Sequence, residues 1–240
     1  MATINDYIKK AKVQGFCLTK FLDSNESSEL RKIKDPTLKI FYNGGYDDAE
    51  RVRAIILDKT EQDPFDYEYE LGIIKVTPKS DIREISHRHV LGTLMSYGIK
   101  RETIGDIVVN SNEIYIFAII DIVPLIIDNL KEINRIGVIS ENCEITDFVN
   151  EIKSEAKTIN VASLRLDAIV SKVLNKSRSD ANEIIEKGLV QINHIECINN
   201  SYQLKTNDLI SIRHFGRIEV KEIVNITKKD RLVLEVIIKH

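Results

Sequence analysis

The chain has 240 residues, of which 43% are hydrophobic and 30% are charged. This length allows one to three domains, and the apolar content is sufficient for buried cores. The formal net charge of −3, from 34 Lys and Arg against 37 Asp and Glu, excludes a polycation that coats nucleic acid through bulk charge. Residues 161–240 carry 13 basic and 10 acidic side chains, a net charge of +3, which leaves −6 for residues 1–160. Any electrostatic contact with a nucleic acid is therefore expected in the C-terminal third.

The three cysteines, Cys17, Cys143 and Cys197, are far apart and lack CxxC spacing. They predict neither a disulfide framework nor a zinc site, and they fit a reducing cytoplasm. The longest apolar run, residues 114–127, contains an aspartate and a proline and is too short to span a bilayer. Lysines interrupt the only candidate for an N-terminal signal sequence. We therefore expect a cytoplasmic protein that binds no membrane, metal or cofactor.

The N-terminal region, residues 1–68, is expected to contain two helices followed by two strands. The first helix ends at Gly15, and Asp23 with Glu26 forms a capping box at the start of the second helix, which continues through Leu30 and Ile33. Strands are predicted at residues 38–43 and 52–58. Gly44 and Gly45 lie between them, but the segment lacks the spacing of nucleotide-binding loops, and its acidic residues would repel phosphate, so nucleotide binding is not expected.

The middle region, residues 69–158, is predicted to fold as a ferredoxin-like βαββαβ domain. This element order also builds RNA-recognition modules. The aromatic pair with which those modules stack bases is absent, and Tyr115 and Phe117 fit a buried core as well as a stacking platform. The predicted elements are a strand at 69–77, a helix at 82–97 opened by Asp81 and Glu84, strands at 104–109 and 113–119, a helix that has Pro124 in its first turn and runs to about 133, and a strand at 136–140.

His87, His89 and Asp106 are the residues of this region that most resemble a catalytic set. Two histidines at positions i and i+2 do not share a helix face and make a poor metal site. An acid–base site is conceivable, but no nucleophile elbow, glycine-rich cofactor loop or paired carboxylates accompany it. The interpretation that we prefer is a polar, basic helix end that docks on RNA or protein, formed by His87, Arg88, Lys100 and Arg101.

The C-terminal region, residues 159–240, is predicted to contain two amphipathic helices followed by short strands. Ser163 is the expected cap of the first helix, whose apolar face is Leu166, Ile169, Val170, Val173 and Leu174. Ser177 and Asp180 are expected to cap the second helix, and Asn193 with His194 to form a tight turn. A terminal hairpin is predicted from strands at 218–227 and 232–239.

The pattern of this region resembles the S4 domain, a small RNA-binding module. In such domains the face that carries the Arg-Leu-Asp start and the Ser-Arg second helix meets structured RNA. The matching positions are Arg165, Leu166, Asp167, Ser177, Arg178, Ala181, Ile185, Gly188, Val190, Asn193, Asp208, Ile210 and Gly216.

Two further blocks resemble the YlmH family of bacterial S4-domain proteins. They are GGYDDAERVRAII at residues 44–56 and HRHVLGTLMSYGIKRETIGDIVV at residues 87–109, in which His89 stands where an acidic residue is expected. The resemblance implies an α+β protein with three parts: an N-terminal helical and β segment, the ferredoxin-like middle domain and the S4 domain. It also implies a non-enzymatic, ribosome-associated RNA-binding protein that joins a stalled large subunit holding peptidyl-tRNA. The expected partners are therefore rRNA, tRNA and the large ribosomal subunit, but not DNA.

Within the S4 region, we expect Arg178 to contact phosphate, aided by the N-terminus of its helix, and Asp167 to hold Arg165 in place rather than to touch RNA. The other residues expected at the RNA face are basic or polar. The full set is Arg165, Asp167, Lys176, Ser177, Arg178, Asn182, Lys187, Asn193, Arg213 and Arg217.

Other classes of protein remain as alternatives. Pseudouridine synthases carry their Arg-Leu-Asp in a separate domain, whereas here it opens the S4 helix. The chain lacks the signatures of tyrosyl-tRNA synthetases and the cofactor loop of methyltransferases. An RNA-modifying enzyme is therefore disfavoured. The main alternative is an adaptor, linked to cell division, whose middle domain binds a protein partner.

Overall fold

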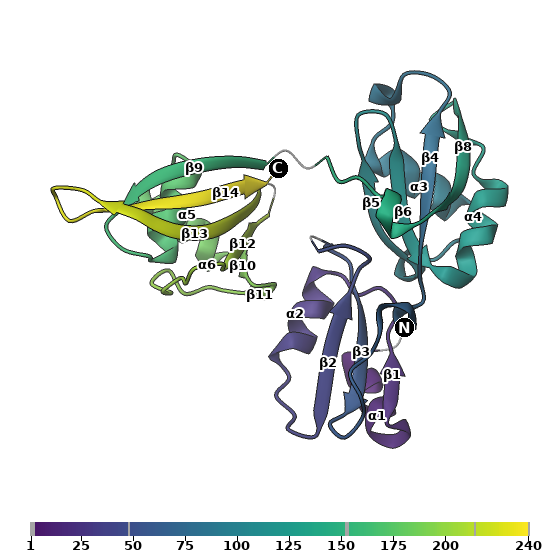
Figure 1. The fold of residues 1–240 in the computed structure, drawn as a ribbon, viewed down its shortest axis with the longest axis horizontal. Coiled ribbons are helices and arrows are strands. Elements are labelled where there is room, and N and C mark those ends of the chain that lie inside the picture. Colours follow the sequence, from purple (N-terminus) through teal and green to yellow (C-terminus); the bar gives the residue numbers. More distant parts are fainter. Residues whose placement is uncertain (1–2, 48, 152–153, 214, 240) are drawn as a thin grey trace. The chain divides into compact units, whose positions relative to one another are not determined.

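The computed structural model describes residues 3–47, 49–151, 154–213 and 215–239, and it divides the chain into two compact units (Figure 1). Unit 1 is Met1–Glu151 and unit 2 is Ile152–His240. No helix in the described ranges combines the length and the hydropathy needed to cross a membrane.

The first part of unit 1 is a three-stranded sheet with the order β1-β3-β2 and two helices. The predicted capping box of Asp23 with Glu26 and the predicted stop at Gly15, which has a φ of 76°, are confirmed, and the first helix also begins with a capping box, Thr3 with Asp6, that was not predicted. The sequence analysis missed β1, a three-residue strand. The elements are α1 (Ile4–Gln14), β1 (Phe16–Leu18), α2 (Ser24–Lys32), β2 (Leu38–Asn43) and β3 (Arg53–Asp58).

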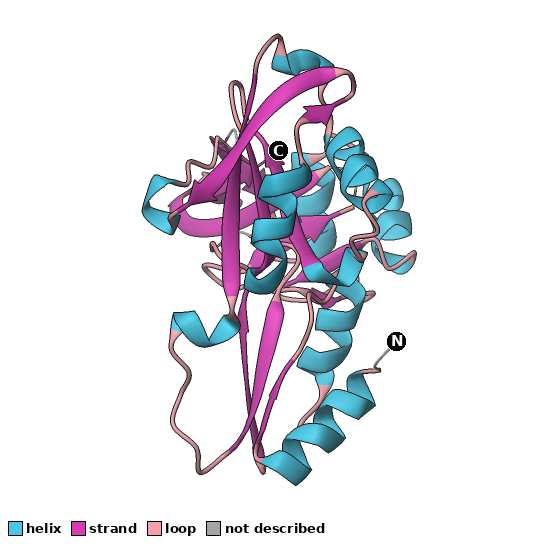
Figure 2. Cartoon of the chain, turned by 90° about the vertical axis from the view of Figure 1, so that its right-hand side faces the viewer, coloured by secondary structure: helices cyan, strands magenta, loops and turns pink. Residues whose placement is uncertain are grey.

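Both faces of this sheet are covered. Apolar side chains of α1 and α2, among them Ile4, Ala11 and Leu30, form one cluster with Ile56 of β3. On the other face Ile55 and Leu57 of β3 pack against Tyr69, which belongs to the short 3₁₀ helix η1 (Asp66–Tyr69). In Figure 2 the loop that leads from β3 to this turn runs on the side of the sheet away from the two helices.

The second part of unit 1 has the predicted ferredoxin-like order. Its sheet runs β5-β6-β4-β8-β7, so the four main strands follow the order 2-3-1-4 that a βαββαβ chain produces. The elements are β4 (Leu71–Pro78), α3 (His87–Ser96), β5 (Ile104–Val109), β6 (Ile114–Ile119), α4 (Val123–Asn129), β7 (Glu132–Ile133) and β8 (Ile136–Cys143).

Two helix boundaries in this part were predicted wrongly. The helix predicted from Ile82 begins only at His87, because Asp81 Oδ1 accepts from the amide of Arg83 and caps a separate 3₁₀ turn, Ile82–Glu84. The helix predicted to reach residue 133 ends at Asn129. The residues that follow form β7, which pairs with β8 across a turn whose residues Asn134 and Arg135 have φ of 48° and 66°.

The aromatic side chains of β6 are buried. Tyr115 is 1% exposed and Phe117 is 0% exposed, and the rings of both lie 5.0 Å from that of Phe148. Phe117 also packs with Phe21 and Tyr46 from the first part of unit 1. These rings therefore belong to a core shared by the two sheets of unit 1 and do not form a stacking platform.

Unit 2 is a six-stranded antiparallel sheet with the order β11-β10-β12-β13-β14-β9 and two helices packed on it. The predicted boundary between residues 158 and 159 falls inside β9, which pairs along the whole of β14 and so belongs to this unit. The predicted terminal hairpin is confirmed as β13 and β14. The elements are β9 (Ser154–Val161), α5 (Leu166–Val173), α6 (Arg178–Glu186), β10 (Val190–Ile192), β11 (Ile195–Glu196), β12 (Leu209–Ile212), β13 (Gly216–Ile226) and β14 (Leu232–Lys239).

Candidate nucleic-acid interface

Helix α5 begins without a side-chain cap. The amides of Leu166 and Asp167 donate instead to the carbonyl oxygens of Tyr202 (2.9 Å) and Asn200 (3.1 Å). The prediction that Ser163 caps this helix is therefore wrong, since the donors are satisfied by a loop that lies far away in sequence. Contact with this loop fixes the backbone of the Arg-Leu-Asp segment.

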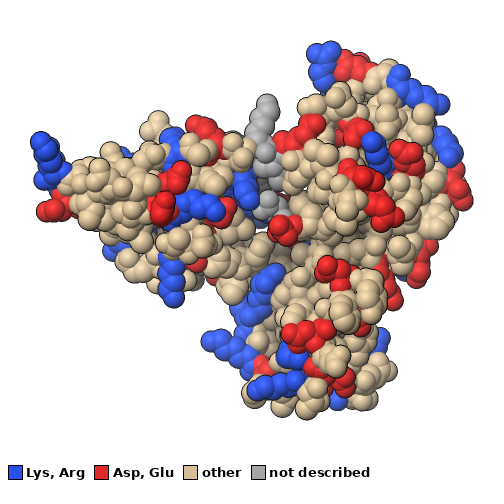
Figure 3. Space-filling model, viewed as in Figure 1, with Lys and Arg blue, Asp and Glu red and all other residues tan. Residues whose placement is uncertain are grey.

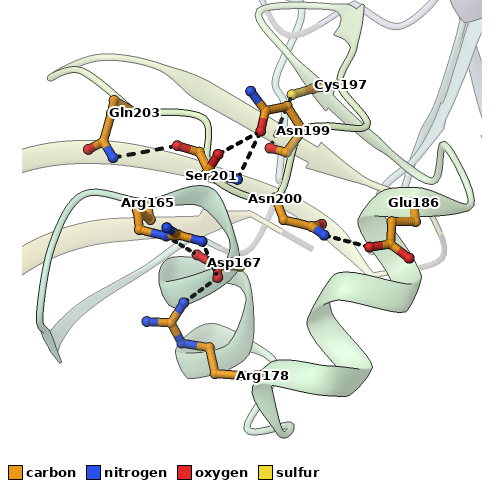
Figure 4. Close-up of polar contacts among 9 residues, drawn as sticks. All are labelled: Arg165, Asp167, Arg178, Glu186, Cys197, Asn199, Asn200, Ser201 and Gln203. Atoms are coloured by element: carbon orange, nitrogen blue, oxygen red, sulfur yellow. Dashed lines mark hydrogen bonds and ion pairs between the residues drawn. The ribbon is translucent and has the colours of Figure 1, made fainter.

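Asp167 joins the two helices through its carboxylate. Arg165 donates to it from Nε and Nη2, at 3.1 Å each, and Arg178, the first residue of α6, approaches it through Nη1 at 2.5 Å. Figure 4 shows the two guanidinium groups reaching Asp167 from different elements. The predicted role of Asp167, to hold Arg165 in place, fits this geometry, which adds Arg178 to the same carboxylate.

The exposure of the three side chains differs sharply. The side chain of Asp167 is 6% exposed, whereas those of Arg165 and Arg178 are 40% and 47% exposed. Burial by itself would raise the pKa of Asp167, but the hydrogen bonds and charges of the two arginines outweigh it and hold the pKa below its usual value. The carboxylate therefore stays ionised and anchors two partly exposed cations.

The turn between the helices is also fixed by hydrogen bonds. Ser171 Oγ donates to the carbonyl of Lys176 (2.8 Å), and Asn175 has a φ of 52°. Ser177 and Asp180 form the predicted capping box of α6. Ser177 therefore acts as a cap, and the carboxylate of Asp180 already lies at the positive end of this helix dipole. This weakens the expectation that the helix N-terminus itself helps to bind phosphate.

The loop from Cys197 to Gln203 completes the site, and the sequence analysis missed it. Asn199 Oδ1 accepts from the amide and hydroxyl of Ser201 (3.0 and 2.9 Å), while Asn200 Nδ2 donates to Glu186 Oε1 of α6 (2.6 Å; Figure 4). The available signal was the run of Asn and Ser at 199–201, which is typical of turns stabilised by their own side chains. It does not indicate contact with a helix start more than thirty residues earlier.

The other predicted residues of the S4 region are not gathered around Asp167 by any described contact. Lys176 and Arg213 are exposed, Asn182 and Arg217 are partly buried, and Lys187 pairs with Glu183 at 2.5 Å. Asn193 and His194 form the predicted turn, with φ of 50° and 66°. The side chain of Asn193 donates to Asp208 (2.8 Å) and accepts from the amide of Leu209 (2.9 Å), so it stabilises the turn.

The basic residues predicted at the helix end of unit 1 have mixed surroundings. Arg88 and Lys100 are exposed. Arg101 is partly buried and donates from Nη1 to the carbonyls of Ile104 (2.7 Å) and Gly105 (3.1 Å). Burial lowers the pKa of Arg101 to about 10. His87 is exposed, and partial desolvation of its imidazole together with the nearby charge of Arg101 lowers its pKa.

Asp106 serves the fold of unit 1. Its carboxylate accepts from the hydroxyl of Tyr46 (2.8 Å) and from the amides of Glu50 (2.7 Å) and Arg51 (3.0 Å), which closes the loop between β2 and β3. In the same loop a side chain at Gly44 would come within 2.5 Å of the carbonyl oxygen of Arg51. These contacts give Asp106 and Gly44 a structural role. Among the described residues, no group of three His, Cys, Asp or Glu could hold a metal ion.

The surface charge is mixed. On the face drawn in Figure 3, basic and acidic side chains are interspersed over unit 2 and do not form a continuous basic surface. A contact with RNA through this unit would therefore depend on a few placed cations, in agreement with its small net charge.

The fold of unit 2 and the matching domain models define the class of protein: a protein with an S4-type RNA-binding domain. The model of the S4 domain matches residues 164–210, and the model described as the putative RNA-binding domain in YlmH matches residues 64–147. The chain is 31% identical over 216 residues to the ribosome-associated protein quality control protein P2 of Bacillus subtilis (strain 168), covering 89% of this chain and 84% of that protein. The chain belongs to the YlmH family.

A solved structure supports the fold. The cell division protein ylmH from Streptococcus pneumoniae matches with a TM-score of 0.55 and 22% identity, covering 61% of this chain and 90% of that one.

Proposed function

We propose that this chain is a non-catalytic protein that docks on structured rRNA and tRNA of the large ribosomal subunit through the Arg165–Asp167–Arg178 site. The observation that carries the proposal is a buried carboxylate that fixes two arginines whose side chains remain 40% and 47% exposed. Within the described contacts, Arg165 Nη1 and Arg178 Nε and Nη2 remain available to donate. Guanidinium groups with spare donors match phosphate oxygens well.

The pairing with Asp167 prepares the arginines for binding. A free arginine side chain loses about 2 kcal/mol of conformational entropy when it is immobilised. Arg165 and Arg178 already share one buried anchor, so part of this ordering precedes contact with RNA. The anchor reduces the local charge, but it holds the two cations at a set separation, which suits a defined RNA shape rather than any polyanion.

The finer function rests on the relatives. The B. subtilis relative is named a ribosome-associated quality control protein, and this supports a role on stalled large subunits that hold peptidyl-tRNA. Such a role places this chain in the cytoplasm. An adaptor role in cell division is the second candidate, and it is favoured only by the name of the S. pneumoniae protein. In that case the RNA contact would be secondary.

Lys176, Lys187, Arg213 and Arg217 extend the proposed RNA face. His87, Arg88 and Lys100 of unit 1 form its proposed secondary contact, beside Arg101, whose Nη1 already donates to the carbonyls of Ile104 and Gly105. If about four to six phosphates are engaged, the log–log slope of affinity against salt concentration is about −3 to −5. Titrations with purified large subunits between about 50 and 300 mM KCl measure this slope, and an affinity that does not change with salt would contradict the proposal.

The direct test of the ribosomal role is sedimentation of the tagged chain from cell lysate through a sucrose gradient, with and without RNase, followed by sequencing of the bound RNA. The proposal predicts migration with the large subunit, release by RNase and recovery of tRNA. Migration in a protein complex that survives RNase would favour the adaptor role and contradict the proposal.

A further inference from the structure

Two aromatic side chains of unit 1 are presented to solvent. Phe65 is 62% exposed and Tyr67 is 76% exposed. Their rings are stacked, with centroids 5.6 Å apart and an angle of 8° between the ring planes. Both lie in the segment that connects β3 to β4, where neighbouring Tyr69 is turned inward and is 4% exposed. One aromatic residue of the segment, Tyr69, is thus buried in the core, and the other two are exposed.

A hollow of about 340 Å³ lies beside these rings. Gln14, Gly15 and Phe16 line it from the end of α1 and the start of β1, and residues 61–65 line it from the opposite side. Phe16 is itself 40% exposed and adds to the apolar part of the wall. The volume is at the lower end of the range for ligand pockets, which suits one or two side chains of a bound segment.

Hydrogen bonds hold the segment in place. Lys39 Nζ donates to the carbonyl of Glu61 (2.6 Å) and to Asp63 Oδ1 (2.7 Å), which ties the segment to β2. The amide of Phe65 donates to Glu68 Oε2 at 2.6 Å, and Asn43 Nδ2 donates to Asp66 at 3.1 Å. The exposed rings therefore stand on an anchored loop, and the entropy lost when a partner orders them is small.

The charge around the hollow indicates its partner. Residues 58–70 contain six acidic side chains and one basic one, a net charge of −5. RNA phosphate and anionic lipid are repelled by such a segment. A cation is attracted both by the carboxylates and by the faces of the aromatic rings. Three of the acidic residues, Glu61, Asp63 and Glu68, line the hollow, and none of the described basic residues lines it. Two of the carboxylates pair with cations outside the segment, Asp63 with Lys39 and Glu70 with Arg53. The acidic residues of the segment are Asp58, Glu61, Asp63, Asp66, Glu68 and Glu70, and the basic one is Lys59.

We propose that this aromatic hollow binds a cationic segment of another protein, with an arginine or lysine on the Phe65–Tyr67 pair and an apolar side chain inside the hollow. The site is separate from the Arg165–Asp167–Arg178 site and does not depend on the RNA-binding function. It gives unit 1 a protein-binding surface of opposite charge to the RNA face of unit 2.

The test uses the full chain and two fluorescent heptapeptides, Gly-Arg-Leu-Arg-Leu-Arg-Gly and its counterpart with Gly in place of Leu. Fluorescence anisotropy measures their affinities for the wild-type chain and for the double variant Phe65→Ser/Tyr67→Ser. The Leu peptide is expected to bind the wild type more tightly than the Gly peptide, and the double variant is expected to weaken it about tenfold or more. The replaced side chains are exposed, so the midpoint of urea unfolding should stay unchanged.

Ile139→Ser is the matched control, because Ile139 is an apolar residue of unit 1 that is 54% exposed and lies on β8. It should bind the Leu peptide as the wild type does. The proposal is overturned if the wild type does not bind the Leu peptide, if both peptides bind equally, or if Phe65→Ser/Tyr67→Ser and Ile139→Ser behave alike. Loss of RNA binding in the double variant would also contradict the separation of the two sites.

Discussion

Unit 1 and unit 2 each contain a buried aspartate near two arginines, and they use it in opposite ways. In unit 2, Asp167 accepts from the side chains of Arg165 and Arg178, which remain 40% and 47% exposed. In unit 1, Asp106 accepts from Tyr46 and from two backbone amides. The nearby guanidinium groups of Arg51 and Arg101 donate to backbone carbonyls instead.

The difference shows how to tell an arginine that binds a partner from one that holds the fold. Arg101 Nη1 donates to the carbonyl oxygens of Ile104 and Gly105 at the start of β5, so this arginine helps to hold the fold of unit 1. In the part of the chain that the structure describes, the guanidinium groups of Arg165 and Arg178 both pair with one carboxylate, that of Asp167. The same residue types thus give a structural site in unit 1 and, in unit 2, the site that we propose for docking on RNA. Three substitutions and one change of pH test this difference.

The largest effect is expected for Asp106→Ala. It leaves the hydroxyl of Tyr46 and two amides without their acceptor in a buried site, and the free energy of unfolding of unit 1 should fall by about 2–4 kcal/mol. Urea unfolding measures the loss. RNA affinity at a temperature where the variant is folded should stay within about twofold of the wild type, since unit 2 is untouched. A loss of RNA affinity equal to that of an Asp167 variant would remove the distinction between the two aspartates.

Asp167→Ala should weaken RNA binding by about 1–3 kcal/mol, because Arg165 and Arg178 lose their common anchor. Simple electrostatics predicts the reverse, since the variant removes a negative charge from the RNA face. Titration of the labelled variant with purified large subunits decides between the two. Tighter binding would show that the carboxylate only reduces the local charge and does not position the arginines.

Arg101→Gln should destabilise unit 1 by about 1–2 kcal/mol through the loss of its hydrogen bonds to Ile104 and Gly105. The effect of Arg101→Gln on RNA affinity shows whether Arg101 only holds the fold or also contacts RNA. The comparison of the two aspartates predicts a change of less than about twofold, to be measured beside Lys100→Gln, an exposed neighbour. A much larger loss for Arg101→Gln in a folded variant would place Arg101 in the RNA interface.

The smallest effect is expected from a change of pH, measured on the free energy of unfolding. The pKa of Asp167 in the folded chain lies below its usual value, so this group contributes stability above the ordinary carboxyl pKa of about 4. That contribution is lost as the pH falls through the lowered pKa. The difference in unfolding free energy between the wild type and Asp167→Asn should thus be constant from about pH 5 to 8 and shrink below about pH 4. A difference in unfolding free energy that grows below about pH 4 would mean that the pKa of Asp167 is raised in the folded chain and not lowered.

Local pattern was sufficient to predict much of the fold. The capping boxes at Asp23 and Ser177, the stop at Gly15 and the turn at Asn193 all depend on neighbouring residues, and all are confirmed. The start of α3 failed because Asp81 and Glu84 fit a capping pair, yet Asp81 caps a separate turn. Competition between two local caps so close together cannot be settled from the residues alone.

The site was predictable only in part. The Arg-Leu-Asp and Ser-Arg segments marked Arg165, Asp167 and Arg178, but their joint ion pair depends on the packing of α5 against α6. The carbonyls that start α5 come from the loop around Asn200 and Tyr202, and no periodicity links the two segments. β9 was missed because its pairing partner, β14, lies at the far end of the chain.

The most direct test of the central claim compares Arg178→Ala with Arg83→Ala in titrations with purified large ribosomal subunits. Both variants remove one exposed arginine that pairs with an aspartate, because Arg83 Nη2 lies 2.6 Å from Asp81 Oδ2 in unit 1. The two pairs differ in the aspartate, since the side chain of Asp167 is buried and that of Asp81 is exposed. The account predicts that Arg178→Ala weakens binding by about 1–3 kcal/mol, or about 5- to 150-fold, and leaves the unfolding midpoint nearly unchanged. It predicts no measurable loss for Arg83→Ala. Equal affinities for the two variants would show that Asp167 and its arginines are not the RNA-binding site.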